Sequence, residues 1–469
     1  MPDNLLVMKF GGTSVGTIQA VNHVEEIVRT AQNNWPRIVI VLSALSGVTN
    51  LLIECADKAS RGQSSVIDST VKELRDRHTN MIRALIHDKP IQTSTQQELD
   101  SLINQFTNLT NAIRILGEST PRALDAIVSL GERFSVRIVS ATLQSKGIRS
   151  EYIDGENIVI TDDQYQNAHP SIEMTEKAAE DSLNPLLDSG IVPVVTGFIG
   201  ATKDGITTTL GRGGSDYSAA LIGASLKAKE VWIWTDVDGV MTADPRMVPN
   251  AGTIEELSYR EVAELAYFGA KVLHPKTIRP VIEAGIGLRI CNTFNPDAPG
   301  TMIVANQDNR DNGKIKAVTI IRDQQMITIE GRGMLGIPGV AARTFGAVAA
   351  TGTSVTLISQ ASSEQSICFT TNAESTPSVL ESLQETFSSE LQRRDIDRIW
   401  ATDAVAIVTV VGAGMRHTPG IAGRVFSALG DQHVNVIAIA QGSSEVSISL
   451  VVDDAEAKDA LLALHKLTE

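Results

Sequence analysis

Residues 8–16, MKFGGTSVG, join a buried strand to a helix through a glycine-rich turn. The preceding residues are apolar (LLV at 5–7), and apolar residues recur at helical spacing from Ile18 onward. Glycines let backbone N–H groups approach an anion, the helix directs its positive end to the same place, and Lys9 adds a cation. The turn therefore predicts a phosphate site, although a purely structural strand–helix turn would carry the same glycines. Its spacing fits neither the dinucleotide nor the Walker pattern.

Size and composition restrict the class of protein. The 469 residues are enough for about three domains, each with its own core. A net charge of −15 without a Lys/Arg cluster argues against nucleic acid or an anionic membrane as a partner. The three cysteines form no CxxC pair, which predicts neither a zinc site nor a disulfide framework but a reducing, cytoplasmic setting. We expect no signal peptide and no membrane span.

Polar loops follow several apolar strands. The stretch 37–42 leads into a hydroxyl-rich loop at 43–50, and 191–196 leads into Gly197 and Phe198. Such strand–loop–helix units predict an open α/β sheet with its site at the carboxyl ends of the strands. Residues from about 51 to 146 have a helical pattern. Within them, Glu132 lies between apolar neighbours, and the pattern alone favours a solvent-facing position for it.

The densest polar signal is TTTLGRGGSD at 207–216, which opens another helix. Arg212 stands between glycines and has little surface to cover, so it is placed to bind a carboxylate or phosphate. Ser215 or Asp216 would equally serve to cap the helix. A run of Thr, Asp and Gly at 235–246 follows the apolar strand 231–234 and suits contacts with ribose, base or metal, although a surface loop has the same composition.

The last third of the chain repeats itself. Aligning Pro338 with Pro419, an offset of 81 residues, superimposes glycines, a helix pattern and the segment Gln-x-Ser-Ser-Glu that begins at Gln360 and again at Gln441. Two copies are too few for a solenoid, so we expect paired α+β modules that share a sheet or an interface. Each copy offers glycine-loop amides able to hold a small carboxylate. The duplication would equally serve dimerisation alone.

Together these motifs resemble aspartate kinase, and the tandem tail resembles its two ACT domains. The motifs that carry the resemblance are KFGGTS at 9–14, GVTN at 47–50, GER at 131–133, LGRGGSD at 210–216, TDVDGV at 235–240 and HPKT at 274–277. The resemblance spans essentially the whole chain. It implies an amino-acid-kinase fold, an eight-stranded and mostly parallel sheet between helices, followed by two ACT modules of ferredoxin-like α+β type.

The resemblance also implies the domain boundaries. We expect a catalytic domain at 1–295, a linker with the first regulatory strand at 296–325, a first ACT domain at 326–400 and a second at 401–469. Because the family inserts its first ACT unit within the second, a strand at about 315–321 should join the second. The chain ends soon after the second repeat, so a monofunctional enzyme without a dehydrogenase domain is expected.

Residue by residue, the resemblance implies three groups at the kinase site. The catalytic residues would be Lys9, Asp216 and Lys276, with Asp216 orienting Lys9. Aspartate would be bound by Ser43, Thr49, Glu132, Phe198, Arg212 and Ser215. The nucleotide would be bound by Lys9, Gly11, Gly12, Ser14, Thr235, Asp236, Arg246 and Lys276. ATP is the expected cofactor with Mg²⁺ held through its phosphates, and no protein metal site is expected.

The implied chemistry suits these residue types. An aspartate side chain has a pKa near 4, so the nucleophile is already ionised and needs no general base. The obstacle is repulsion between that carboxylate and the triphosphate, which two lysines and glycine-loop amides would offset. Arg212 would pair with the α-carboxylate of aspartate and Glu132 with its ammonium group. The product would be 4-phospho-L-aspartate, at the first step of the pathway to lysine, threonine and methionine.

The ACT pair implies feedback inhibition by an amino acid and assembly into a homodimer or homotetramer. The expected effector contacts are Met334, Gly339, Val340, Ser354, Val355, Thr356, Gln360 and Gln441. Lysine-sensitive members usually carry Asp where this chain has Thr356, and a neutral amide suits a neutral ligand, so threonine is favoured and lysine is next. Two rivals remain: another carboxylate kinase of the same fold, and a non-catalytic amino-acid sensor, which would require a degraded active site.

Overall fold

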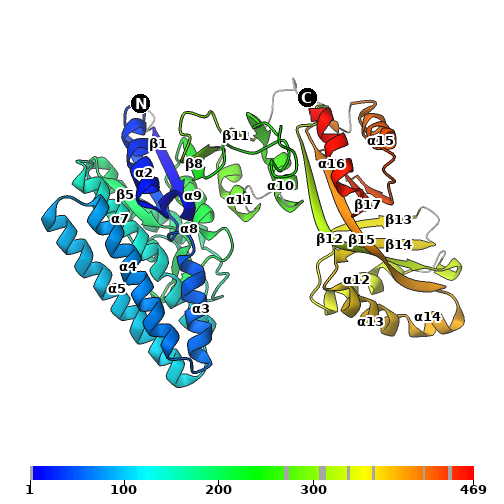
Figure 1. Cartoon of the computed structure of the whole chain (residues 1–469), viewed down its shortest axis with the longest axis horizontal. Coiled ribbons are helices and arrows are strands. Elements are labelled where there is room, and N and C mark those ends of the chain that lie inside the picture. The colour runs from blue at the N-terminus through cyan, green and yellow to red at the C-terminus, as the bar shows by residue number, and fades with distance from the viewer. Residues whose placement is uncertain are drawn as a thin grey trace. The chain divides into compact units, whose positions relative to one another are not determined.

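The structure is a computed structural model of the chain, and it describes residues 4–268, 273, 275–305, 313–334, 338–361, 365–415, 418–441 and 446–468. The side chains at 275, 276 and 278 are also outside the described part. The chain divides into two compact units (Figure 1). The first contains Met1–Val240, Thr253–Tyr259 and Leu273–Asn306; the second contains Met241–Gly252, Arg260–Val272 and Gln307–Glu469.

An eight-stranded sheet forms the centre of the first unit, in the order β3-β5-β2-β1-β8-β10-β11-β9. Every neighbouring pair is parallel except β10 with β11, which confirms the predicted mostly parallel sheet. Strand β1 is buried along its whole length between β2 and β8. The strands are β1 Leu5–Phe10, β2 Arg37–Leu42, β3 Ser150–Ile153, β5 Val192–Thr196, β8 Glu230–Thr235, β9 Glu256–Ser258, β10 Gly287–Asn292 and β11 Thr301–Val304.

Helices of the first unit bury their apolar faces on this sheet and on one another. Residues of α2 to α7 join strands β1, β2 and β5 in one hydrophobic core, and the predicted helical span 51–146 is confirmed. The helices are α1 Gly12–Val15, α2 Ile18–Ala31, α3 Val48–Ser60, α4 Ser65–Leu85, α5 Lys89–Leu116, α6 Pro121–Val128, α7 Leu130–Ser145, α8 Ile172–Asp188, α9 Gly214–Ser225 and α11 Pro275–Glu283. No helix in the described ranges is both long and apolar enough to cross a membrane.

A separate, small sheet of the first unit has three strands in the order β4-β6-β7. Its strands are β4 Ile160–Thr161, β6 Ile199–Thr202 and β7 Thr207–Thr209. Strand β4 begins at Ile160, because the Val159 N–H bonds to the Gly155 carbonyl and closes the turn around the short helix η1 Gly155–Asn157. Strand β7 leads directly into the glycine-rich loop at 210–213.

The second unit is built on a six-stranded antiparallel sheet in the order β13-β14-β12-β15-β17-β16. Its elements are η3 Arg332–Met334, α12 Val340–Ala350, α13 Thr376–Thr386, α14 Ser388–Arg393, α15 Ile421–Asp431, α16 Ala457–His465, η5 Lys466–Thr468, β12 Ala317–Glu330, β13 Leu357–Gln360, β14 Ser366–Asn372, β15 Arg398–Val411, β16 Ala438–Ala440 and β17 Ser447–Asp453. The predicted duplication is confirmed, since α12 and β14 shifted by 81 residues coincide with α15 and β17.

The strand β12 serves both repeats (Figure 1). Its first part, 317–321, pairs with 407–411 of β15, and its last part, 324–330, pairs with β14. A register shift with Asp323 in the left-handed region (φ 58°) separates the two parts. The strand expected at about 315–321 is therefore the first part of one long strand that continues to Glu330.

Two segments from within the span 1–295 pack with the second unit. Ala243 and Val248 join the core formed by Val318, Ala406 and their neighbours. Helix α10, Tyr259–Tyr267, is followed by Phe268, which belongs to the same hydrophobic cluster as Met326. The first unit is therefore not one continuous span that ends near residue 295, because these apolar side chains belong to the cores of the second unit.

Candidate active site

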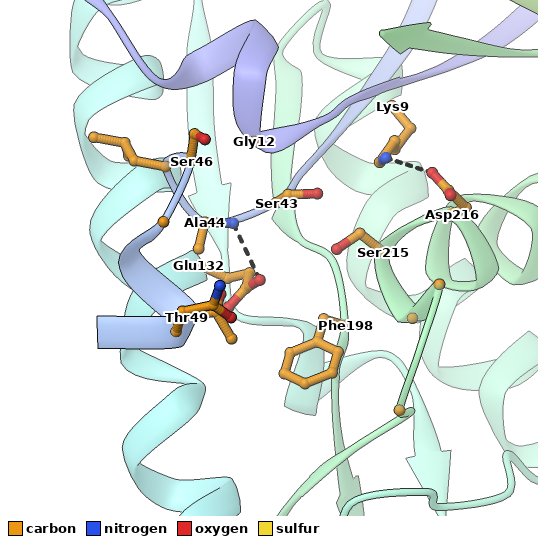
Figure 2. Close-up of a pocket in the computed structure, with 16 residues that line it drawn as sticks. Lys9, Gly12, Ser43, Ala44, Ser46, Thr49, Glu132, Phe198, Ser215 and Asp216 are labelled. Carbon is orange, nitrogen blue, oxygen red and sulfur yellow. Dashed lines mark hydrogen bonds and ion pairs between the residues drawn. The ribbon is translucent and has the colours of Figure 1, made fainter. Parts of the chain in front are cut away.

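A cleft of about 370 Å³ opens in the first unit where β1, β2 and β5 end (Figure 2). Loops at the carboxyl ends of parallel strands meet at one edge of the sheet, which is where ligands bind in open α/β folds. The lining residues are Lys9, Gly12, Ser43, Ala44, Leu45, Ser46, Gly47, Thr49, Asn50, Glu132, Phe198, Gly211, Gly213, Gly214, Ser215 and Asp216. Segments that are far apart in the sequence, from Lys9 to Asp216, thus contribute to one cavity.

An ion pair between Lys9 and Asp216 crosses one side of the cleft (Figure 2). Pairing of β1 with both β2 and β8 fixes the backbone of Lys9, and Asp216 lies in the first turn of α9. Their side chains are only 10% and 18% exposed. A carboxylate that holds a lysine head in place keeps a cation aimed at the cavity without the entropy loss of ordering it at each binding event.

Glu132 lies at the opposite side, on the first turn of α7. The Ala44 N–H donates to its Oε1 at 3.1 Å, while Oε2 is buried and has no hydrogen-bond partner among the described atoms. Burial raises the pKa of this carboxyl to about 8, against a smaller opposing effect of the Ala44 N–H. A carboxylate that lines a cavity and keeps one oxygen without a partner is suited to receive a cationic ligand.

The solvent-facing position favoured for Glu132 by the sequence pattern is wrong, since the side chain is 3% exposed. Helix α7 is buried on almost all sides at its start, where Leu130, Gly131 and Phe134 are also covered. The helix lies between the sheet and α3 to α5, so periodicity carries no information about an outer face there.

The loop at 43–50 is fixed by close backbone contacts. The Ser46 N–H donates to the Gly12 carbonyl at 3.0 Å, and a Cβ at Gly12 would lie 2.9 Å from the Ala44 carbonyl oxygen. From α4, the Arg77 guanidinium donates to the Ser46 carbonyl at 2.7 Å. The glycine of the first motif is therefore required for the two loops to approach each other.

Phe198 adopts a left-handed backbone conformation (φ 69°), which a bulky residue rarely takes. Its N–H donates to Ser218 Oγ at 2.9 Å and its carbonyl accepts from the Leu210 N–H at 3.0 Å. Its ring covers Gly214, where a Cβ would lie 2.7 Å from Cδ2. Such strain, of about 1–3 kcal/mol, persists where surrounding contacts hold it, and here it directs the ring into the cleft.

Other residues predicted for substrate and nucleotide occupy varied positions. Arg212 is exposed and does not line the cleft, although Gly211 and Gly213 on either side of it do. Ser14 is fully buried: it donates to the Trp234 carbonyl at 3.3 Å and accepts from Thr293 at 2.7 Å, so its hydroxyl holds the sheet edge.

The predicted nucleotide residues divide between the two units. Gly11 bonds through its N–H to the carbonyl of Trp234, the residue before Thr235 and Asp236, so β1 and β8 end side by side. Arg246 belongs to the second unit, is 77% exposed and pairs with Asp244 at 2.6 Å. The side chain of Lys276, like the whole of His274, lies outside the described residues.

The predicted effector residues surround the start of α12 and the edge strands of the second unit. Gly339 caps α12 with φ 89°, Met334 is buried, and Ser354 to Thr356 lead into β13. Gln360 ends β13, Gln441 follows β16, and Val340 begins α12. Thr356 donates to the side chain of Gln324 at 3.1 Å, a partner that sequence reasoning did not find.

Asp125 was also missed from the sequence. It is fully buried on α6, and its carboxylate accepts from the Gln166 N–H and from both the N–H and the hydroxyl of Thr209, at 2.8–3.2 Å. Burial raises the pKa of the carboxyl, and these donors lower it. Its signal in the sequence is an acidic residue in an otherwise apolar stretch, Leu124 to Val128.

Comparison with known proteins agrees with this geometry. A model of the amino acid kinase family matches residues 4–292, and an ACT domain model matches 327–387 and 408–467. Bifunctional aspartokinase/homoserine dehydrogenase 2 of Arabidopsis thaliana is 37% identical over 98% of this chain. The chain spans about half the length of such bifunctional relatives, 50% in that case. Lysine-sensitive aspartokinase 3 of Escherichia coli is 32% identical over 98% of both chains.

Solved structures give the same result. Escherichia coli aspartokinase III in complex with aspartate and ADP superimposes with a TM-score of 0.79 at 30% identity, covering 99% of each chain. The same enzyme in complex with lysine and aspartate gives 0.79 at 31% identity, covering 99% of this chain and 100% of that one. The chain therefore belongs to the amino acid kinase family, as an aspartokinase with tandem ACT domains.

Proposed function

We propose that this chain is an aspartate kinase, which transfers the γ-phosphoryl group of ATP to the side-chain carboxylate of L-aspartate. The observation that carries the proposal is the buried carboxylate of Glu132, which lines the same cleft as Lys9 and Asp216 and whose Oε2 has no hydrogen-bond partner among the described residues. An amino-acid substrate supplies the missing ammonium partner. The solved relative that binds aspartate and ADP supports this assignment.

In this mechanism the substrate carboxylate attacks directly. It is ionised near neutral pH, so no residue has to remove a proton. Glu132 holds the ammonium group of aspartate, and Ser43, Thr49 and Ser215 offer hydroxyls from the cleft walls. Lys9, oriented by Asp216, neutralises charge as the two anions approach, and the amides of Gly11 and Gly12 cradle phosphate. Catalysis is then positioning and electrostatics.

ATP would enter with Mg²⁺ bound to its phosphates. In the described part of the chain, no group of three His, Cys, Asp or Glu side chains is arranged to hold a metal ion. Asp216 lines the cleft, and its carboxylate already forms an ion pair with Lys9. Nucleotide-borne Mg²⁺ fits this donor set, as is usual for an ion that keeps several waters.

An assay that couples ADP release to NADH oxidation tests the proposal. We expect turnover with ATP and L-aspartate, and none with succinate, which has the same two carboxylates without an ammonium group for Glu132. Turnover with succinate comparable to that with aspartate would contradict the proposal that Glu132 binds the ammonium group of the substrate. Turnover with another amino acid but not with aspartate would instead indicate a different carboxylate kinase of this fold.

For regulation, we propose threonine as the feedback effector, with lysine as the competing candidate. Several of the predicted effector residues are neutral: Thr356 is hydrogen-bonded to Gln324, Gln360 ends β13 and Gln441 follows β16. A lysine ammonium would require a carboxylate there. The lysine complex of Escherichia coli aspartokinase III supports the alternative. Initial rates with threonine, lysine and both together distinguish a single effector from concerted inhibition.

The proposal includes a homodimer or homotetramer formed through the ACT modules and a reducing, cytoplasmic setting. The free thiols of Cys55, Cys291 and Cys368 support the reducing environment, since two of the three are buried and none is paired. Light scattering at several protein concentrations, with and without effector, measures the assembly. A mass independent of concentration and equal to one chain would contradict it.

A further inference from the structure

We propose that Asp125 is a positioning residue for the kinase reaction: it clamps the glycine-rich loop at 210–213 to the helix pair that carries Glu132. The inference rests on the proposed function, because it assigns Asp125 a role in aspartate binding. Asp125 neither lines the cleft nor touches a reacting atom. It acts through the residues to which it is bonded.

The first half of the clamp is the end of β7. Thr209 donates to Asp125 twice, from its N–H at 3.0 Å and from its hydroxyl at 2.8 Å. One residue later the chain enters the loop at 210–213, whose Gly211 and Gly213 line the cleft. The last anchored residue before that loop is thus held by two hydrogen bonds to a buried carboxylate, which are stronger than bonds between neutral groups.

The second half is the turn at 164–168. The Gln166 N–H donates to both oxygens of Asp125, at 3.0 and 3.2 Å, and Gln166 is in the left-handed region with φ 69°. Its carbonyl oxygen faces Gly211, where a Cβ would lie only 2.9 Å away. The strained turn therefore forms the backing of the glycine loop, and Asp125 stabilises the strained conformation.

Asp125 connects this wall to the opposite one through its own helix. Its carbonyl accepts from the Ser129 N–H at 3.1 Å, and the Ser129 carbonyl accepts from the Arg133 N–H at 3.3 Å, so α6 continues closely into α7. Glu132 lies in that first turn of α7. One buried residue is thereby bonded both to the helix pair that carries Glu132 and to Thr209, the residue before the loop at 210–213.

The carboxylate accepts from three donor groups, the N–H of Gln166 and the N–H and hydroxyl of Thr209. An Asn side chain keeps one oxygen for the two N–H groups and turns its NH₂ group toward the Thr209 hydroxyl, which can accept from it but loses the carboxylate as acceptor for its own proton. At least one buried donor is then left without its acceptor. If the loop relaxes in response, we expect the affinity for aspartate to fall more than the affinity for the nucleotide. The reason is that the loop leads to Ser215, which is predicted to bind aspartate.

The test compares Asp125→Asn with two other variants of the full chain. Thr209→Val removes one hydroxyl donor while keeping the N–H and the shape. Glu25→Gln is the matched control: Glu25 is another buried carboxylate of the first unit, paired with Arg29 at 2.6 Å and Lys146 at 3.0 Å, and it does not line the cleft. Circular dichroism melting identifies a temperature at which all the proteins are folded.

At that temperature we expect D125N to raise KM for aspartate about 10-fold or more, with KM for ATP changed less than about 2-fold. T209V should shift KM for aspartate in the same direction by a smaller factor, and E25Q should leave both constants unchanged. An unchanged KM for aspartate in folded D125N, or an equal rise in E25Q, would overturn the inference.

Hydrogen–deuterium exchange separates this inference from the proposed kinase activity. Loss of protection at the amides of Gln166 and Thr209 and across 210–215 in D125N, but not in E25Q, supports the clamp even if the wild type lacks turnover with aspartate. Retained protection there in D125N rejects it. Absence of wild-type turnover would count against the kinase proposal alone.

Discussion

At the scale of single residues, the role proposed for Glu132 predicts that aspartate binding depends on pH. Burial raises its pKa to about 8 in the free chain, whereas an ammonium ligand requires the ionised form. Binding below pH 8 must therefore release a proton. We expect kcat/KM for aspartate to rise about 10-fold per pH unit between pH 6 and 7 and to level near pH 8. Initial rates at saturating ATP measure the profile, and a flat profile over this range would contradict it.

The same shift predicts that Glu132→Gln is more stable and less active than the wild type. The folded pKa, about 8, exceeds the ordinary value of 4.5, so between these pH values the folded state binds more protons and stability falls as pH rises. Gln removes that loss, which is on the order of 4 kcal/mol near pH 8. Thermal melting at pH 5 and pH 8.5 should show a gain only at the higher pH.

A gain of equal size at pH 5 would mean that packing, and not ionisation, explains the E132Q effect. Activity provides the second half of the comparison, because Gln cannot neutralise the substrate ammonium. We expect KM for aspartate to rise about 100-fold or more, as for loss of a buried charged partner. Such a trade of stability for function is common at binding sites.

These residues show how far sequence reasoning extends at this scale. Motif resemblance identified Glu132 and the Lys9–Asp216 pair, and the structure brings all three to one cleft. Periodicity placed Glu132 in solvent because it cannot recognise a helix covered on all sides. Asp125 escaped notice since its function depends on donors 41 and 84 residues away, which no local pattern connects.

At the scale of elements, α10 contacts the predicted effector segment. The Tyr267 hydroxyl at its end donates to the Val355 and Thr356 carbonyls at 3.3 and 3.4 Å, and Glu264 accepts from Ser447 at 2.7 Å. In sequence the helix precedes the 274–277 motif. The Tyr267→Phe variant should still bind effector within about 3-fold of the wild type, yet be inhibited less at saturation.

Titration calorimetry and inhibition curves measured on the same samples separate binding from coupling in Y267F. Tyr152→Phe is the control, since it also loses one hydroxyl bond, to Glu98 at 2.7 Å, in the first unit. Tyr267 is 52% exposed, so its hydroxyl contributes little to folding and both variants should melt near the wild type. Unchanged maximal inhibition in Y267F would show that the α10 contact does not transmit the effector signal.

Elements were the best-predicted level of the structure. Buried strands and the 81-residue repeat follow from local apolar patterns, so α12 and α15 could be expected at matching positions. What local patterns could not show is that β12 is a single strand shared by both repeats, because its division depends on pairing with β14 and β15. Local patterns also could not show that 241–252 and most of α10 belong to the second unit, because their apolar partners lie far along the sequence.

For the whole molecule, the two compact units have separate hydrophobic cores, so loss of catalysis need not disturb effector binding. Lys9→Met tests this. It removes the cation beside Asp216 but keeps the length of the side chain, and we expect turnover to fall about 1,000-fold or more. Calorimetric titration with threonine and lysine should give the wild-type affinity, because no effector residue is altered.

Lys58→Met is the control for K9M, since Lys58 pairs on the surface of the same unit with Glu54 at 2.5 Å and should be dispensable. A non-catalytic amino-acid sensor predicts the opposite relation, in which wild type and K9M both lack turnover and both bind the amino acid. If K9M loses effector binding together with activity while its melting is unchanged, the two units do not act independently. If K9M retains turnover, Lys9 does not neutralise the charge between the substrate carboxylate and the ATP phosphates. The prediction of a phosphate site at residues 8–16 would then also be wrong.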